Sequence, residues 1–225
     1  MKFIFIPITV FIFLFLNYTA MSQQQYSYLA LGDSYTIGET VSIYENFPYQ
    51  TVQLLRKKGF AFHAPDIVAK TGWTTDELEA GIKRTQLHPV YDFVSLLIGV
   101  NNQYRGRSAE EYAKEFEALL KKAIAFSGNN PSHVFVLSIP DWGATPFAEG
   151  RDRKKIAAEI DVFNSVNKSI AEKYRVNYID ITPGTREAAQ DESLLAADKL
   201  HPSGKDYARW AEKLSEYIIK LIRMK

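Results

Sequence analysis

The sequence predicts an α/β fold in which helices cover both faces of a parallel sheet. Five short apolar runs stand out in the 225 residues, and segments with helical periodicity separate them. Most of these runs are continuous rather than alternating, which is typical of strands that are buried on both faces. Strands that alternate with helices form a parallel sheet with helices on its two sides.

The expected strands follow one another along the chain at residues 28–31, 61–68, 93–98, 134–139 and 176–181. After the first strand, Phe47, Val52 and Leu55 share one helical stripe, and Gly59 is expected to end that helix. The terminal helix has an apolar face opposite Lys, Glu and Arg. That face consists of Tyr207, Trp210, Leu214, Ile218 and Leu221.

Two further helices are expected to begin at the S/T-x-x-E pattern of a capping box. In the first, Thr74 precedes Glu77, and in the second, Ser108 precedes Glu111. After the second start, apolar residues recur at helical spacing. They are Tyr112, Phe116, Leu119 and Ala123.

The composition excludes several classes of protein. With 46% hydrophobic and 24% charged residues, the chain has globular rather than disordered composition. Its 27 basic and 26 acidic residues leave a formal charge of +1, so nucleic-acid binding is not expected. The absence of cysteine excludes disulfides, thiolate metal sites and a cysteine nucleophile. Residues 23–225 are expected to form a single domain.

The first residues have the order of a secretory signal peptide. Lys2 precedes an apolar run over residues 3–16, and the small residues Ala20 and Ser22 follow. We expect cleavage after Ser22, with Ala20 as the alternative last residue. The run is shorter than the ~20 residues that span a bilayer. Residues 1–22 are therefore predicted to be a signal peptide of a secreted or periplasmic protein, and an uncleaved anchor is the alternative.

Residue types suited to acyl transfer follow the strands, at the edge where parallel sheets bind ligands. Gly32, expected to allow a sharp turn, comes two residues before Ser34. A serine hydroxyl needs a base to act as a nucleophile, and histidine suits because its unperturbed pKa is about 6.5. Of the four histidines, only His201 has a carboxylate at a useful offset, Asp198, and it precedes a helix that Ser203 is expected to cap.

Four blocks, in this order, resemble the SGNH (GDSL-type) hydrolase family. They are Gly32-Asp33-Ser34, Gly72, Gly99-x-Asn101 and Asp198-x-x-His201-Pro202. The resemblance implies a three-layer α/β/α sandwich with a flavodoxin-like parallel sheet of about five strands. It also implies a serine esterase or lipase that forms an acyl-enzyme without a metal or cofactor.

The same resemblance assigns the roles of individual residues. Ser34 is the expected nucleophile, His201 the general base and acid, and Asp198 the carboxylate that orients the histidine. The backbone N–H groups of Ser34 and Gly72 and the side-chain amide of Asn101 are the expected oxyanion hole. Asn102 departs from the family pattern, which usually has aspartate there. We expect this departure to affect the local support of the neighbouring Asn101 and not catalysis.

Three residues are candidates for the substrate pocket, namely Asp33, Tyr104 and Trp142. The substrate is expected to be a small-molecule, lipid or glycan ester, and the sequence leaves the oligomeric state open. The alternatives within the family are a carbohydrate O-deacetylase and a lysophospholipase or thioesterase. A non-enzymatic alternative is a flavodoxin-like module in which residues 34–38 hold a phosphate or flavin.

Overall fold

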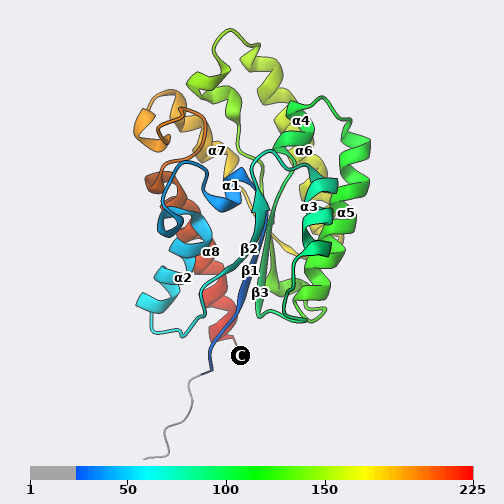
Figure 1. Cartoon of the computed structure of the whole chain (residues 1–225), viewed down its shortest axis with the longest axis vertical. Helices are drawn as coiled ribbons and strands as arrows, with labels where there is room; N and C mark the ends of the chain where they lie inside the picture. Colours follow the sequence, from blue (N-terminus) through cyan, green and yellow to red (C-terminus); the bar gives the residue numbers. More distant parts are fainter. Residues whose placement is uncertain (1–23, 225) are drawn as a thin grey trace, which may run out of the picture.

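The protein is described here from a computed structural model, which covers residues 24–224 (Figure 1). The predicted signal peptide at residues 1–22 lies outside the described residues. Within residues 24–224, no helix combines the length and the apolar character that crossing a bilayer requires.

One parallel sheet forms the centre of the molecule, with the strand order β2-β1-β3-β4-β5. The strands are β1 (Tyr28–Asp33), β2 (Asp66–Lys70), β3 (Phe93–Leu97), β4 (Val134–Leu137) and β5 (Asn177–Ile179). All four neighbouring pairs are parallel. The predicted fold class is therefore confirmed. The chain changes direction across the sheet between β1 and β3, which is where ligands bind in sheets of this order.

The helices are α1 (Ser34–Ile37), α2 (Phe47–Lys57), α3 (Thr75–Arg84), α4 (Val100–Tyr104), α5 (Ala109–Phe126), α6 (Arg153–Lys173), α7 (Thr182–Thr185) and α8 (Gly204–Arg223). The longer ones form the two outer layers, and the short α1, α4 and α7 lie toward one end of the sheet (Figure 1). Figure 1 shows α2 and α8 packed together on one side of the sheet, and α3 and α5 on the other, where α6 contacts α5. Short 3₁₀ turns complete the connections at Ile43–Glu45, Pro131–His133, Trp142–Ala144, Pro146–Ala148, Arg186–Ala189 and Glu192–Leu194.

Buried side chains hold the helices on the sheet in the pattern that the sequence predicts. On α8, Tyr207, Trp210, Leu214 and Ile218 are each at most 2% exposed. Burying a side chain such as leucine or isoleucine contributes ~1.5–3 kcal/mol. The apolar stripe of α8 is therefore sufficient to fix this helix, and with it the loop that precedes it.

The capping signals locate two helix starts correctly. The carboxylate of Glu77 accepts from the N–H of Thr74 at 2.9 Å, directly before α3. Before α5, the Ser108 hydroxyl accepts from the N–H of Glu111 at 3.1 Å. Because α3 and α5 begin at these residues, the loops that lead into them end at defined points near the carboxyl edge of the sheet.

The second strand differs from its prediction, since it begins at Asp66 rather than at residue 61. Pro65 lacks an N–H and cannot join a ladder as a donor. Upstream of it, only Phe62 forms an isolated bridge, with Tyr26. The strand instead extends to Lys70, which brings the following residues Thr71 and Gly72 to the end of the sheet.

Candidate active site

Ser34 is the first residue of α1 and lies at the carboxyl end of strand β1, which is paired on both sides, with β2 and β3. Asp33 caps this short helix, since its Oδ1 accepts from the Tyr35 N–H at 3.0 Å. Gly32 does not provide the turn that we expected. It remains within the strand, and a Cβ there would lie 2.1 Å from Thr36 Oγ1 and 2.4 Å from the carbonyl oxygen of Leu97. Glycine is required at this position because the space is already occupied.

His201 lies beside Ser34, although the two residues are far apart in the sequence. Its Nε2 lies 2.9 Å from Ser34 Oγ, across 167 residues of sequence. Its Nδ1 lies 2.6 Å from Asp198 Oδ2. The other carboxylate oxygen, Oδ1, accepts from the N–H groups of Leu200 and His201, each at 3.0 Å. The structure thus places hydroxyl, imidazole and carboxylate in one hydrogen-bonded chain.

The charge of Asp198 determines which nitrogen of the ring carries the proton. Partial burial opposes ionisation, but the hydrogen bonds from the His201 ring and from two backbone N–H groups outweigh it and lower the pKa of Asp198. An ionised carboxylate only accepts hydrogen bonds, so Nδ1 of His201 must donate. Nε2 is then free to accept the proton of the Ser34 hydroxyl.

The loop that carries His201 is held by backbone pairing and not by the serine cap that the sequence predicted. The Ser203 hydroxyl makes no cap hydrogen bond to α8 and instead donates to the carbonyl of Ser193 at 2.7 Å. Two backbone bonds of 2.8 Å enclose the turn, from Ala196 N–H to the His201 carbonyl and from Ser203 N–H to the Leu194 carbonyl. The imidazole is therefore positioned by a small antiparallel bridge.

Gly72 lies in a turn beyond β2 and faces the same pocket as Ser34. Its φ of +83° is in the left-handed region, which favours glycine. The turn is closed by a 3.2 Å hydrogen bond from Trp73 N–H to the carbonyl of Lys70. Asn101, at the start of α4, donates from Nδ2 to the carbonyl of Trp73 at 3.0 Å. Since an amide NH₂ has two protons, the second can be directed at a ligand.

Asn102 is fully buried and ties α4 to the first turn of α3. Its Oδ1 accepts from the Thr75 N–H at 3.1 Å, and its Nδ2 donates to Thr75 Oγ1 at 2.6 Å. The Thr75 hydroxyl in turn donates to Glu115. An amide at position 102 therefore makes two hydrogen bonds of its own next to Asn101, which supports the local structure despite the departure from the family pattern.

The predicted pocket residues divide into two groups. Trp142 and Tyr104 line the pocket at Ser34, with their ring centroids 5.3 Å apart, and Trp142 Nε1 donates to Gln103 Oε1 at 2.8 Å. Asp33 is not part of the lining, and its side chain is fully buried. Burial raises the pKa of Asp33 to about 7, and the hydrogen bond from Tyr35 N–H offsets this rise only in part.

The pocket has a volume of about 190 Å³ and a mainly apolar wall. Its lining is Ser34, Tyr35, Thr71, Gly72, Val100, Asn101, Tyr104, Trp142, Phe147, Leu200 and His201. Five of these lining residues were not predicted from the sequence, namely Tyr35, Thr71, Val100, Phe147 and Leu200. The position of Leu200 beside His201 was an available signal, whereas Phe147 lies in an irregular segment without periodicity. Ser34, His201 and the residues expected to supply the oxyanion donors, Gly72 and Asn101, thus all line one small cavity.

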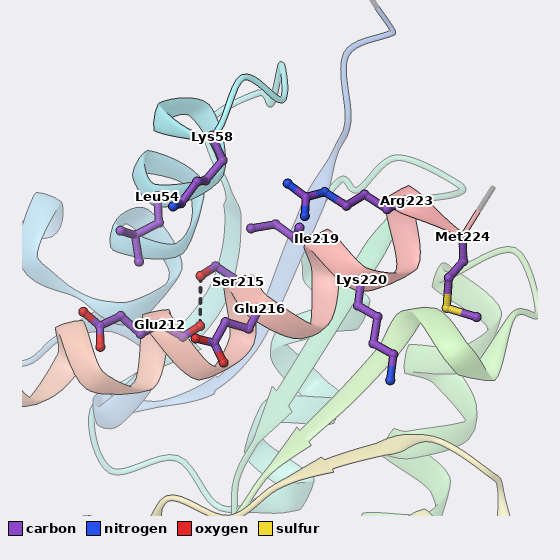
Figure 2. Close-up of a pocket in the computed structure, with 9 residues that line it drawn as sticks. All are labelled: Leu54, Lys58, Glu212, Ser215, Glu216, Ile219, Lys220, Arg223 and Met224. Carbon is purple, nitrogen blue, oxygen red and sulfur yellow. Dashed lines mark hydrogen bonds between the residues drawn. The ribbon is translucent and has the colours of Figure 1, made fainter.

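A wider groove lies elsewhere, between α2 and α8, with a volume of about 660 Å³ (Figure 2). Its nine lining residues include no histidine. The only serine among them, Ser215, donates its hydroxyl to the carbonyl of Glu212 at 2.9 Å. This groove therefore has no activated nucleophile. Within residues 24–224, no group of three or more His, Asp or Glu side chains is arranged to hold a metal ion.

The chain matches the model of one known protein family. A family model described as the GDSL-like Lipase/Acylhydrolase family matches residues 30–209. Among curated protein sequences, none matches the chain.

Several solved structures have a similar fold. The crystal structure of TesA has a TM-score of 0.66 at 16% identity and covers 87% of this chain and 98% of its own. Axe2, an acetylxylan esterase from Geobacillus stearothermophilus, has a TM-score of 0.67 at 19% identity, with coverage of 86% and 94%. A member of the lipolytic protein G-D-S-L family from Veillonella parvula has a TM-score of 0.66 at 18% identity, with coverage of 86% and 97%. At these identities the likeness is one of fold.

Proposed function

Since this chain belongs to the GDSL-like lipase/acylhydrolase family and is a hydrolase of ester bonds, we propose that it cleaves carboxylic esters through an acyl-enzyme on Ser34. The single observation that carries the proposal is the hydrogen-bonded chain from Asp198 through His201 to Ser34, with distances of 2.6 and 2.9 Å. These are the distances at which a base can take the proton of a nucleophile.

The first half-reaction forms the acyl-enzyme. Ser34 Oγ attacks the ester carbonyl carbon while Nε2 of His201 takes the hydroxyl proton. The carbonyl oxygen becomes negative, and the N–H groups of Ser34 and Gly72 and the amide of Asn101 stabilise it. Loss of one such donor typically costs ~2.7–4 kcal/mol of barrier. The carbonyl then re-forms, the bond to the alcohol oxygen breaks, and His201 returns its proton to the leaving alcohol.

The second half-reaction releases the acid. Water replaces the alcohol, His201 takes one of its protons, and the hydroxide oxygen attacks the acyl carbon. The bond to Ser34 Oγ breaks, and the serine recovers a proton from His201. Throughout, the ionised Asp198 stabilises the imidazolium and keeps Nδ1 protonated.

The pocket supports a compact ester as the substrate. Its volume of about 190 Å³ is below the ~300–1,000 Å³ that is usual for larger ligands. The walls formed by Val100, Trp142 and Leu200 suit a short apolar group. We therefore propose short-chain carboxylic esters as the first substrates to test.

Deacetylation of a glycan is the second candidate, since it also transfers a small acyl group. Tyr104 and Phe147 line the pocket and are 46% and 45% exposed, so their rings offer a surface on which a sugar can stack. The structural neighbour Axe2 is an acetylxylan esterase, which supports this second candidate. A phosphate or flavin module has less support, because α1 has only four residues and the Tyr35 N–H is engaged by Asp33.

The experiment that tests the proposal compares the wild type with Ser34→Ala on short-chain, long-chain and sugar-acetate esters. The wild type should hydrolyse at least one class and become labelled on Ser34 by a fluorophosphonate, as mass spectrometry would detect. The variant should do neither while keeping its thermal midpoint. Turnover that survives in the variant would exclude the acyl-enzyme on Ser34.

Export is proposed on the N-terminal pattern alone. Lys2, the apolar run over residues 3–16 and the small residues at 20–22 support a signal peptide that is removed after Ser22. Mass spectrometry of the mature chain from an exporting host should find Gln23 as the first residue, and a chain that retains Lys2 would contradict the proposal.

A further inference from the structure

The direction of the Gly72 N–H depends on the type of one turn. Residues 70–73 form a β-turn, because Trp73 N–H donates to the carbonyl of Lys70 at 3.2 Å. Gly72, the third residue, has a φ of +83°, whereas Thr71 has no positive φ. This combination defines a type II turn. The central peptide, which carries the Gly72 N–H, takes no part in the closing hydrogen bond.

A flip of that central peptide would remove the Gly72 donor from the site. Types I and II differ by a rotation of about 180° of this peptide. In type I, the Thr71 carbonyl would point where the Gly72 N–H now points, and an oxyanion would meet an oxygen rather than a donor. Glycine can adopt both types, and type I is the commoner of the two. Glycine at the third position favours type II, and contacts from outside the turn can hold the turn in place at the site.

Arg105 supplies such support. Its Nη2 donates to the carbonyl of Gly72 at 2.6 Å, and its Nη1 lies 3.3 Å from Glu77 Oε2. The peptide that follows Gly72 is thus held at both ends, by Arg105 at its oxygen and by Lys70 at its N–H. Arg105 directly follows α4, four residues after Asn101, which donates to the carbonyl of Trp73.

We propose that Arg105 is a positioning residue that holds the turn against α4, in the place where Gly72 N–H faces the oxyanion. The inference rests on the proposed function, in which Gly72 is an oxyanion donor. The Arg105 side chain is 43% exposed and is absent from the pocket lining, so it acts through Gly72 and not by contact with the substrate.

The kinetic signature separates positioning from a structural role. Arg105→Ala should lower kcat on a short p-nitrophenyl ester by about 10- to 100-fold, approaching the ~10²–10³ expected when one donor is lost completely. KM and the thermal midpoint should change little, because an exposed ion pair contributes little to stability. Arg105→Lys keeps one charged donor but loses the planar fork, and it should recover part of the rate.

Arg107 provides the matched control. It also joins the segment after α4 to α3, through a 2.7 Å contact with Asp76, but its remaining ionic partners are Glu111 and Glu115 on α5 and not the carbonyl of Gly72. Arg107→Ala should therefore leave kcat unchanged. An equal loss of kcat in the two variants would show that the bridge to α3 matters in general, and it would overturn the role of Arg105.

A double-mutant cycle tests whether Arg105 acts through Gly72. Gly72→Ala disfavours the φ of +83° and should remove the donor by itself. In that background, Arg105→Ala should cost less than about twofold more in kcat, because the two residues form one unit. Full additivity overturns the inference, as does an Arg105→Ala single variant within about twofold of the wild type.

The outcome for the wild type separates the two proposals. If the wild type is active, Ser34→Ala is inactive and Arg105→Ala is unaffected, only the inference about Arg105 fails. If the wild type hydrolyses no ester and takes up no fluorophosphonate, the proposed function fails and the role of Arg105 fails with it.

Discussion

Replacing Asp198 by asparagine would change the tautomer of His201 while preserving the shape of the turn. An asparagine oxygen can keep the two 3.0 Å hydrogen bonds from Leu200 and His201 N–H that now reach Oδ1. The amide NH₂ then replaces Oδ2, 2.6 Å from Nδ1. Because NH₂ donates, the ring must carry its proton on Nε2, and Nε2 can no longer accept the proton of Ser34.

The expected loss is large in rate and small in stability. The same exchange in a Ser-His-Asp triad lowers kcat by ~10⁴, which corresponds to about 5 kcal/mol of barrier. The side chain of Asp198 is 28% exposed, so losing its charged hydrogen bond to His201 should cost about 1–2 kcal/mol of folding free energy. The stability that Asp198 contributes is present above its unfolded pKa and is lost as pH falls through its lowered folded pKa.

The assay is the hydrolysis of a short p-nitrophenyl ester at neutral pH, together with thermal unfolding of each variant. Glu192→Gln is the matched control, because Glu192 precedes the same turn and its carboxylate pairs with the exposed Lys199, at 2.6 Å. It should keep the wild-type rate. An Asp198→Asn variant that loses less than about tenfold would refute the tautomer argument.

Three further outcomes are expected. Asn101→Ala should lower kcat by ~10²–10³ in steady-state kinetics with an unchanged circular dichroism spectrum, and a wild-type rate would remove it from the oxyanion hole. Gly81→Ala gains about 1 kcal/mol of helix propensity, but its Cβ would lie 2.2 Å from the Trp73 ring, an overlap that costs ~1–3 kcal/mol. The thermal midpoint should therefore not rise, and a raised midpoint would contradict the packing argument. Burial raises the pKa of Asp33 to about 7 from an ordinary 3.8. Below pH ~4 the carboxyl group is protonated in the folded and the unfolded protein, and the stability that it contributes is complete. As the pH rises to ~7 the unfolded protein ionises first, and up to about 4 kcal/mol of folding free energy is lost. Asp33→Asn should remove this slope in urea unfolding at several pH values, and equal slopes in variant and wild type would show that Asp33 titrates normally.

Much of the fold follows from local patterns. The continuous apolar runs that became β1 and β3 predicted buried strands, and the capping pair Thr74 and Glu77 predicted where α3 begins. These signals are readable because they act over a few residues, through burial or a single hydrogen bond. The prediction for the second strand was wrong at its start, because it relied on the apolar residues at 61–65 and did not account for Pro65, which has no N–H to donate.

Other expectations failed because they depend on what a residue meets in space. Ser203 was expected to cap α8, but the carbonyl of Ser193 competes for its hydroxyl. Asp33 was a candidate for the substrate pocket, but its side chain is fully buried and is not part of the pocket lining. Gly32 was expected to turn the chain. Glycine is needed there for another reason, because Thr36 and the carbonyl oxygen of Leu97 on β3 leave no space for a side chain. None of these partners could be identified from sequence spacing.

The amino-acid sequence by itself determined which chemical groups stand at the ends of the strands, because each follows an apolar run within a few residues. It also determined the spacing of Asp198 and His201, which one turn brings together. Only the tertiary structure decided that His201 reaches Ser34, that Phe147 enters the pocket and that Arg105 holds Gly72. Those contacts join segments that are distant in the chain, and they form because the strand order brings separate loops to one edge of the sheet.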